Sequence, residues 1–78
     1  MGKLEELRRR ASDINDGIYC FYSKGDFFIN PLKENHIEVY VYGKDYVFSS
    51  VEEVFNTPFL NGKKIPEVLN EITWEKRI

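Results

Sequence analysis

Apolar residues recur at helical spacing in the first segment of the chain. They are three or four positions apart over residues 3–16, which predicts a helix with one apolar face. The residues on that face are Leu4, Leu7, Ala11 and Ile14. Gly17 follows as a residue that can end the helix at positive φ. Because the apolar stripe is narrow, we expect this helix to depend on packing against another element.

Residues 18–30 change to a pattern typical of strands. Two runs rich in Ile, Tyr and Phe flank Lys24-Gly25, and this arrangement predicts a β-hairpin. A two-residue turn would pair Phe21 with Phe28, whereas a three-residue loop ending in Gly25 would pair Phe21 with Phe27. The residues of the turn do not decide between the two pairings.

Two residues of this hairpin carry further expectations. Cys20 stands inside the first strand beside apolar neighbours, so we interpret it as a small buried hydrophobic residue. Pro31 has no amide hydrogen to donate to a sheet, so the second strand is expected to end near Asn30.

A second hairpin is predicted over residues 37–48. A two-residue turn at Gly43-Lys44 would pair Val41 with Tyr46, whereas a three-residue loop would gather four rings on one face. Glycine at the first turn position favours the two-residue type II′ turn. The core face would then hold Ile37, Val39, Val41, Tyr46 and Phe48, and the opposite face Glu38, Tyr40, Tyr42 and Asp45.

Helix signals return after the second hairpin. Ser50 followed by Glu53 fits a capping box, which predicts a helix beginning at Val51. The segment Asn56-Thr57-Pro58 should end that helix after less than two turns, because the residue before a proline is pushed out of the α region. This second helix is therefore expected to be short.

The last segment predicts a turn and a further helix. Asn61-Gly62 suits a turn with positive φ, and Pro66 suits the first position of a helix. The apolar face of that helix would consist of Ile65, Val68, Leu69 and Ile72. Trp74 either packs back on the sheet or extends the strand-like segment 72–74 as an anchor at an interface.

Together these elements predict one small α+β domain covering residues 1–78. We expect two layers: an antiparallel β-meander of about four strands in two hairpins, covered on one face by the N-terminal helix and two short C-terminal helices. A chain of 78 residues supports one small core, so most of its large aromatic side chains are expected to be structural.

Composition limits the classes of function and the compartment. The net charge of −2 lacks the basic excess of a generic nucleic-acid binder, and the Arg8–Arg10 triplet is interpreted as a solvated helix face. A single cysteine and the lack of an apolar leader or membrane span predict a cytoplasmic protein. Frequent Lys, Asn, Ile, Tyr and Phe, all encoded by AT-rich codons, suggest a bacterial or phage gene.

Motifs that carry catalytic chemistry are largely absent from the sequence. Asn61–Lys64 has a Gly-Lys pair but lacks the remaining residues of a phosphate-binding loop. His36 is the only histidine, and it has no second ligand at metal-binding spacing, so we predict neither a metal site nor a cofactor. The sequence favours a protein without enzymatic activity.

What remains is a candidate contact surface. Two exposed tyrosines beside an acid are typical of protein interfaces, so we predict a module that binds another protein or a second copy of itself. The candidate partner-binding residues are Glu38, Tyr40, Tyr42, Lys44, Lys63, Lys64 and Trp74. The alternative is a single-stranded nucleic-acid binder in which Tyr40 and Tyr42 stack on bases and the three lysines contact phosphates.

Overall fold

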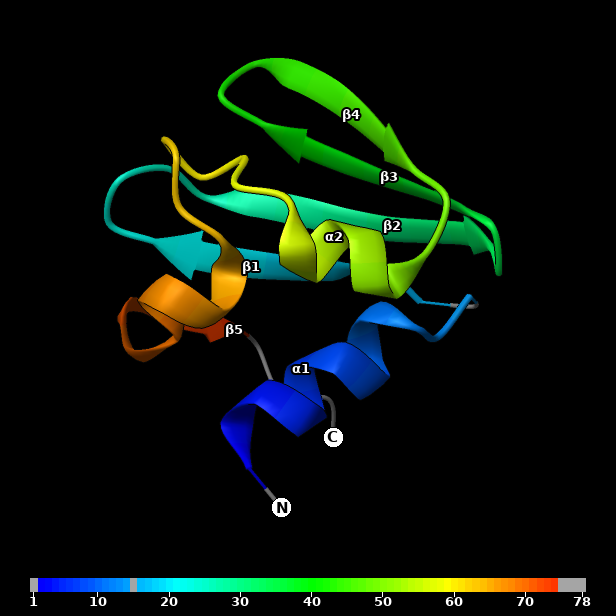
Figure 1. The fold of residues 1–78 in the computed structure, drawn as a ribbon, viewed down its shortest axis with the longest axis horizontal. Coiled ribbons are helices and arrows are strands. Elements are labelled where there is room, and N and C mark those ends of the chain that lie inside the picture. Colours follow the sequence, from blue (N-terminus) through cyan, green and yellow to red (C-terminus); the bar gives the residue numbers. More distant parts are fainter. Residues whose placement is uncertain (1, 15, 75–78) are drawn as a thin grey trace.

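The computed structural model of the chain describes residues 2–14 and 16–74 (Figure 1). A helix, four strands, a second helix, a 3₁₀ helix and a fifth strand follow one another along the sequence. They are α1 (Lys3–Ala11), β1 (Ile18–Tyr22), β2 (Phe27–Lys33), β3 (His36–Val41), β4 (Lys44–Phe48), α2 (Val51–Asn56), η1 (Ile65–Glu71) and β5 (Ile72–Trp74).

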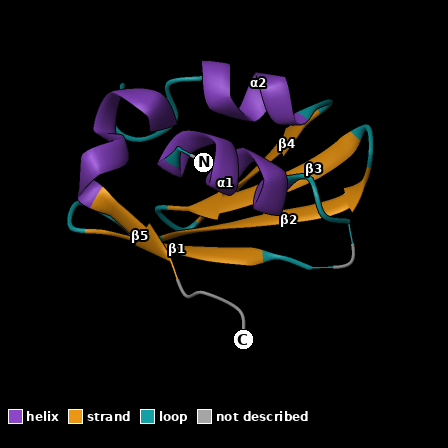
Figure 2. Ribbon diagram, turned by 90° about the horizontal axis from the view of Figure 1, so that it is seen from below, coloured by secondary structure: helices purple, strands orange, loops and turns teal. Residues whose placement is uncertain are grey.

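The strands form one antiparallel sheet in the order β4-β3-β2-β1-β5. Seen along the sheet, α1, α2 and η1 all lie on the same side of it (Figure 2). The two-layer α+β prediction is therefore confirmed. The prediction of about four strands was wrong by one, because β5 adds to the edge of β1.

Strand β5 forms because the final apolar stripe does not stay helical. Val68 already leaves helical geometry at φ −120° and ψ 19°, and Ile72 is extended at φ −106° and ψ 135°. From Ile72 onwards the chain pairs with β1, which places Ile72 opposite Tyr22 and Trp74 opposite Cys20. Pairing with an open sheet edge has thus replaced the last part of the predicted helix.

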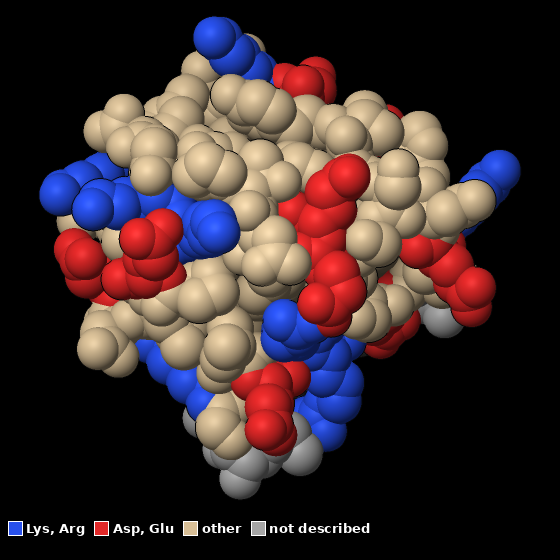
Figure 3. All heavy atoms as spheres, viewed as in Figure 1, with Lys and Arg blue, Asp and Glu red and all other residues tan. Residues whose placement is uncertain are grey.

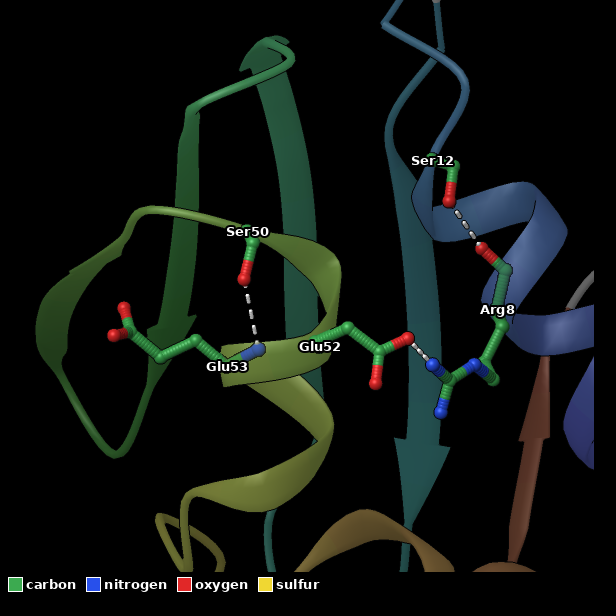
Figure 4. Close-up of polar contacts among 5 residues, drawn as sticks. All are labelled: Arg8, Ser12, Ser50, Glu52 and Glu53. Atoms are coloured by element: carbon green, nitrogen blue, oxygen red, sulfur yellow. Dashed lines mark hydrogen bonds and ion pairs between the residues drawn. The ribbon is translucent and has the colours of Figure 1, made fainter.

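Helix α1 is shorter than the 3–16 segment predicted from spacing. It ends at Ala11, where the Ser12 hydroxyl donates a hydrogen bond to the Arg8 carbonyl oxygen at 2.7 Å (Figure 4). Such local bonds from serine compete with continuation of a helix. Ile14 is consequently 48% exposed, and Gly17 does not serve as the helix end.

The first hairpin has neither of the two pairings considered from sequence. Phe28 lies opposite Tyr19, and Phe27 lies opposite Cys20. The turn is at Ser23-Lys24, closed by a hydrogen bond from the Gly25 amide to the Tyr22 carbonyl oxygen at 3.0 Å. The Asp26 carboxylate accepts from the Tyr22 amide at 2.9 Å, so a side chain takes the place of a ladder bond beside the turn.

The second hairpin turns at Tyr42-Gly43 and not at Gly43-Lys44. Both turn residues have positive φ, 54° and 73°, which is the geometry of a type I′ turn. Tyr46 therefore pairs with Val39 instead of Val41. Because this register differs from the predicted one by two residues, the strand residues keep their faces: Tyr46 and Phe48 pack on the core side, and Tyr40 lies on the opposite side. The prediction for Tyr42 was wrong, because Tyr42 lies in the turn and not in the strand.

Pro31 does not end β2, contrary to the prediction. The strand runs on to Lys33, and the register shifts between Pro31 and Lys33. This β-bulge explains how a proline is accepted, since bulges are among the few places in a sheet that tolerate one. Leu32, the extra residue of the bulge, is 47% exposed.

The core lies between the sheet and the helix layer. Each helix contributes buried residues to it, namely Leu7 and Ala11 from α1, Val54 and Phe55 from α2, and Ile65 and Val68 from η1. Arg8 also joins two helices: it forms an ion pair with Glu52 (Figure 4), and its guanidinium lies 5.2 Å from the centre of the Phe55 ring.

The predicted start of α2 is confirmed. The Ser50 hydroxyl accepts from the Glu53 amide at 3.1 Å, while the Glu53 carboxylate accepts from the Ser49 amide at 2.8 Å. We expect Ser50→Ala to lower the free energy of unfolding by about 1 kcal/mol, since an amide at the helix start loses its acceptor. Urea unfolding followed by circular dichroism measures the loss. Ser49→Ala is the matched control, and an equal loss there would contradict the capping role.

Candidate functional site

The face of the sheet that points away from the helices is covered by no described element (Figure 2). Several large apolar side chains of this face reach solvent, with Tyr19 50%, Phe21 39%, Tyr40 52% and Val47 60% exposed. Phe28 lies among them and is half-buried. We call these five residues, Tyr19, Phe21, Phe28, Tyr40 and Val47, the open face.

Three of the rings form a row across neighbouring strands. Tyr40 on β3 is opposite Phe28 on β2, and Phe28 is opposite Tyr19 on β1. The ring centres of Tyr19 and Phe28 are 6.3 Å apart, and those of Tyr19 and Phe21 are 5.3 Å apart. These distances are within the usual range for aromatic pairs, so the rings of Tyr19, Phe21 and Phe28 form one cluster. Tyr40 extends the row through its strand pairing with Phe28, without ring contact.

A glycine makes room for one of these rings. A Cβ atom added at Gly17 would lie 2.3 Å from Cζ of Phe28 and 3.3 Å from the Ile29 carbonyl oxygen. The Phe28 ring therefore lies against the backbone ahead of β1. This contact explains why Phe28 is half-buried on a face that is otherwise exposed.

The charged side chains next to Tyr40 on this side of the sheet are both acidic, whereas Lys33 lies farther along, at the end of β2 opposite His36. Asp45 lies directly opposite Tyr40 on the neighbouring strand, and Glu38 precedes Tyr40 by two positions on the same strand. His36 Nε2 lies 3.4 Å from a Glu38 carboxylate oxygen, a partner that the sequence did not indicate. No described residue pairs with the carboxylate of Asp45.

Of the tyrosines predicted as contact residues, only Tyr40 lies in the row. Tyr42 is a turn residue, and its ring packs against Gly25, where an added Cβ would be 2.3 Å from Cε1. Partial burial raises the pKa of Tyr42, and the neighbouring hydroxyls of Tyr22 and Tyr46 raise it further. Tyr42 therefore lies at the turn end of the sheet, beside residues of the core side, although it is 43% exposed.

The predicted lysines are not brought to the row of rings. Lys63 closes the tight Leu60–Lys63 turn, whose Asn61 and Gly62 have positive φ as expected from sequence. The Lys64 amide donates to the Glu67 carboxylate at 2.8 Å at the start of η1. Both lysines thus belong to the helix layer. Lys44 is exposed at the beginning of β4 and pairs with Val41, a core-side residue.

Trp74 faces the helix layer. It lies opposite the buried Cys20, packs against the core, and has the Lys3 ammonium 5.7 Å from its ring centre. Its indole nitrogen is buried without a hydrogen-bond partner among the described residues. The structure shows Trp74 packed on the core, as in the first alternative, and also the strand over residues 72–74 that the second alternative included. A role of Trp74 at an interface stays a prediction.

Tyr19, Phe21 and Phe28 were not identified as surface residues from sequence. The strands that carry them are apolar at nearly every position. The sequence therefore lacks the alternation of apolar and polar residues that distinguishes the buried side of a strand from its exposed side. Only the alternation of odd and even positions could have identified them. Tyr19 and Phe21 flank the buried Cys20 on β1, and Phe28 lies between the buried Phe27 and Ile29 on β2.

Cys20 is the small buried hydrophobic residue that was predicted. It has no exposed surface, and burial raises the pKa of its thiol to about 12 while the charge of Arg10 lowers it to a smaller extent. The thiolate is the reactive form of cysteine, so this thiol is inert at neutral pH.

The raised pKa predicts a pH-dependent difference in stability. The pKa of the thiol is 9.0 when the chain is unfolded and about 12 when it is folded. The free energy of unfolding is therefore unaffected by the thiol's ionisation well below pH 9 and decreases as the pH rises towards 12. At pH 10 the loss is about 1.4 kcal/mol. We expect the stability difference between wild type and Cys20→Ala in urea unfolding to shrink by this amount between pH 7 and pH 10. A constant difference would contradict the prediction.

No known family model matches this chain, and neither the curated proteins nor the solved structures include a match to it. Within the described residues, no three His, Cys, Asp or Glu side chains are grouped so that they could hold a metal ion. None of the described helices has the length and apolar character needed to cross a membrane.

Proposed function

We propose that this chain is a non-enzymatic protein-interaction module and that the open face is its binding surface. The observation that carries the proposal is the row of solvent-exposed rings on a side of the sheet that no described element covers. A large aromatic side chain has roughly 150–250 Å² of surface, so these half-exposed residues leave on the order of 300–500 Å² of apolar surface in contact with water. Contiguous apolar patches of this size on a monomer are often functional.

The two residues that a catalytic reading would use do not favour it. Cys20 is buried with its thiol protonated at neutral pH. His36 lies at the beginning of a strand with Glu38 as its neighbour, and the described residues do not place it in a group of His, Cys, Asp or Glu side chains that could hold a metal ion. We place the protein in the cytoplasm, where a single unpaired thiol is stable.

Charge distribution favours a protein partner over single-stranded nucleic acid. The rings that would stack on bases lie beside Glu38 and Asp45, which would repel phosphates. The lysines that would neutralise phosphates, Lys63 and Lys64, belong to the other layer. On the helix-covered side, basic and acidic side chains are interspersed, without one extended basic surface (Figure 3).

Site-specific photocrosslinking tests the proposed surface. A photoreactive phenylalanine analogue replaces Val47 on the open face or, as the matched control, Asn70 on the helix side; both native residues are exposed. In cells from which the gene comes, we expect a discrete crosslinked protein from position 47 and none from position 70. Equal crosslinking from both positions would contradict the assignment of the surface.

The protein partner of the open face could also be a second copy of this chain, and the mass of the protein in solution tests this. Light scattering during size-exclusion chromatography, from about 1 µM upwards, measures the mass across the range in which specific complexes form. A dimer that dissociates in Tyr19→Ser/Tyr40→Ser, with unfolding unchanged, assigns the partner as the chain itself. A monomer at every concentration leaves a different protein as the partner.

A further inference from the structure

We infer that the open face recognises a cationic segment of its protein partner and that an arginine or lysine side chain lies over the ring of Tyr40, between Asp45 and Glu38. This inference rests on the proposed function, because it names the chemistry of the partner that the same surface binds. The partner is a protein that presents an extended, basic and apolar segment.

The first step is the position of Tyr40 relative to the two carboxylates. Asp45 is its direct neighbour on β4, and the Cβ atoms of such cross-strand pairs lie about 4.5–5.5 Å apart. Glu38 lies two positions earlier on β3, on the same side of the sheet and about 7 Å away along the strand. An exposed ring is thus flanked by carboxylates in two directions.

The second step is the state of those groups in the free protein. Tyr40 is 52% exposed, and in the described part of the chain its ring stacks on no other ring and lies against no cation. No described residue neutralises Asp45, whereas Glu38 has His36 at 3.4 Å. The site therefore holds at least one uncompensated negative charge beside an aromatic face.

The third step is the ligand chemistry that this arrangement fits. The face of an aromatic ring attracts a cation within about 6 Å of its centre, and arginine is the more frequent partner because its planar group stacks on the ring. A carboxylate beside the ring can accept hydrogen bonds from the same guanidinium. Phe28 and Tyr19 continue the row away from the acids and offer apolar surface to neighbouring side chains of the partner.

The same charges disfavour the two other occupants. A second copy docked with its Tyr40 over this Tyr40 would bring Asp45 and Glu38 of both copies together, where like charges repel each other. Single-stranded nucleic acid would place phosphates beside the same acids. A basic protein segment is the occupant that matches both the negative charge beside Tyr40 and the apolar surface of the neighbouring rings.

A matched set of labelled peptides tests the inference with the full chain. The probe is a ten-residue peptide in which arginine alternates with valine, and its control has glutamine in place of every arginine. Titration into ¹⁵N-labelled protein is followed by NMR at low and at physiological salt. We expect the arginine peptide to bind about tenfold tighter than the glutamine peptide, to weaken with salt, and to shift the amide signals of residues 38–47.

Variants separate a local effect from a change in net charge. We expect Glu38→Gln/Asp45→Asn to weaken the arginine peptide about tenfold and Tyr40→Leu to weaken it about threefold, since the leucine keeps apolar contact but loses the ring. The control Glu5→Gln/Glu71→Gln removes the same charge from exposed positions of α1 and η1 and should change binding less than about twofold. Urea unfolding of each variant verifies that it is folded.

Three results would overturn the inference. They are equal binding of the arginine and glutamine peptides, equal weakening by the face variant and its control, and failure of the arginine peptide to bind at low salt. Binding of an oligothymidine to the wild type that is lost in Tyr40→Leu would assign the surface to nucleic acid instead. If the arginine peptide does not bind while position 47 still crosslinks to a protein, the result contradicts the cationic partner but agrees with the proposed function. If position 47 does not crosslink either, both proposals are contradicted.

Discussion

Replacing Phe27 with alanine is expected to lower the free energy of unfolding by about 3–5 kcal/mol, the usual cost of deleting a buried phenylalanine ring. Phe27 is 1% exposed, lies between Cys20 and Val41 in the middle of the sheet, and meets the Phe59 ring edge-on at a centre distance of 5.8 Å. A chain of this length has a total stability of roughly 4–12 kcal/mol, so the variant would be close to unfolding.

Urea unfolding monitored by circular dichroism measures this loss, and thermal unfolding provides a second measurement. Tyr40→Ala is the matched control, because it removes an aromatic ring from a neighbouring strand on the exposed side. The control is expected to cost at most about 1 kcal/mol. Similar losses in both variants would contradict the division of the sheet into a core side and an open side.

Gly25→Ala is the second substitution with a large expected effect. Gly25 has φ +146°, a conformation that side-chain-bearing residues rarely adopt, and an added Cβ would lie 2.3 Å from Cε1 of Tyr42. The backbone strain alone is expected to cost about 1–3 kcal/mol, and displacement of the Tyr42 ring adds to it.

A double-mutant cycle separates these two contributions. In a Tyr42→Ala background the ring is absent, so Gly25→Ala should cost less than in the wild type by the steric part alone. Gly43→Ala is the control for strain, since φ there is +73° and nothing lies within 4 Å of the added Cβ. Additive effects of the Gly25 and Tyr42 substitutions would show that the ring does not pack on Gly25.

The division of residues between the two sides of the sheet was predictable, whereas the pairing was not. Strand alternation has a period of two, so a register error of two residues left Tyr46 and Phe48 on the core side. The error arose at the turn: glycine favours a turn position with positive φ, but a tyrosine at φ 54° is uncommon, and the pattern gave no reason to place Tyr42 there.

Tertiary pairing explains most of the other differences. The capping box at Ser50 and the turn at Asn61-Gly62 depend on residues close in sequence, and both were predicted. Strand β5 depends on the free edge of β1, which is distant in sequence. The spacing therefore assigned Ile72 to a helix, and the strand-like character of residues 72–74 was only one of two alternatives. Of the candidate contact surface, Tyr40 and Glu38 were identified from sequence, but the rings of β1 and β2 required the structure.

The sheet order has a consequence for the order in which the protein can fold during synthesis. Strands β1 to β4 pair with their neighbours along the chain, whereas β5 pairs with β1, the most distant strand in sequence. Closing this long loop costs more entropy than forming either hairpin, and the ribosome delivers β5 last. The edge of β1 therefore stays unpaired until Trp74 has left the ribosome, and during that interval a strand of another nascent chain can compete for it.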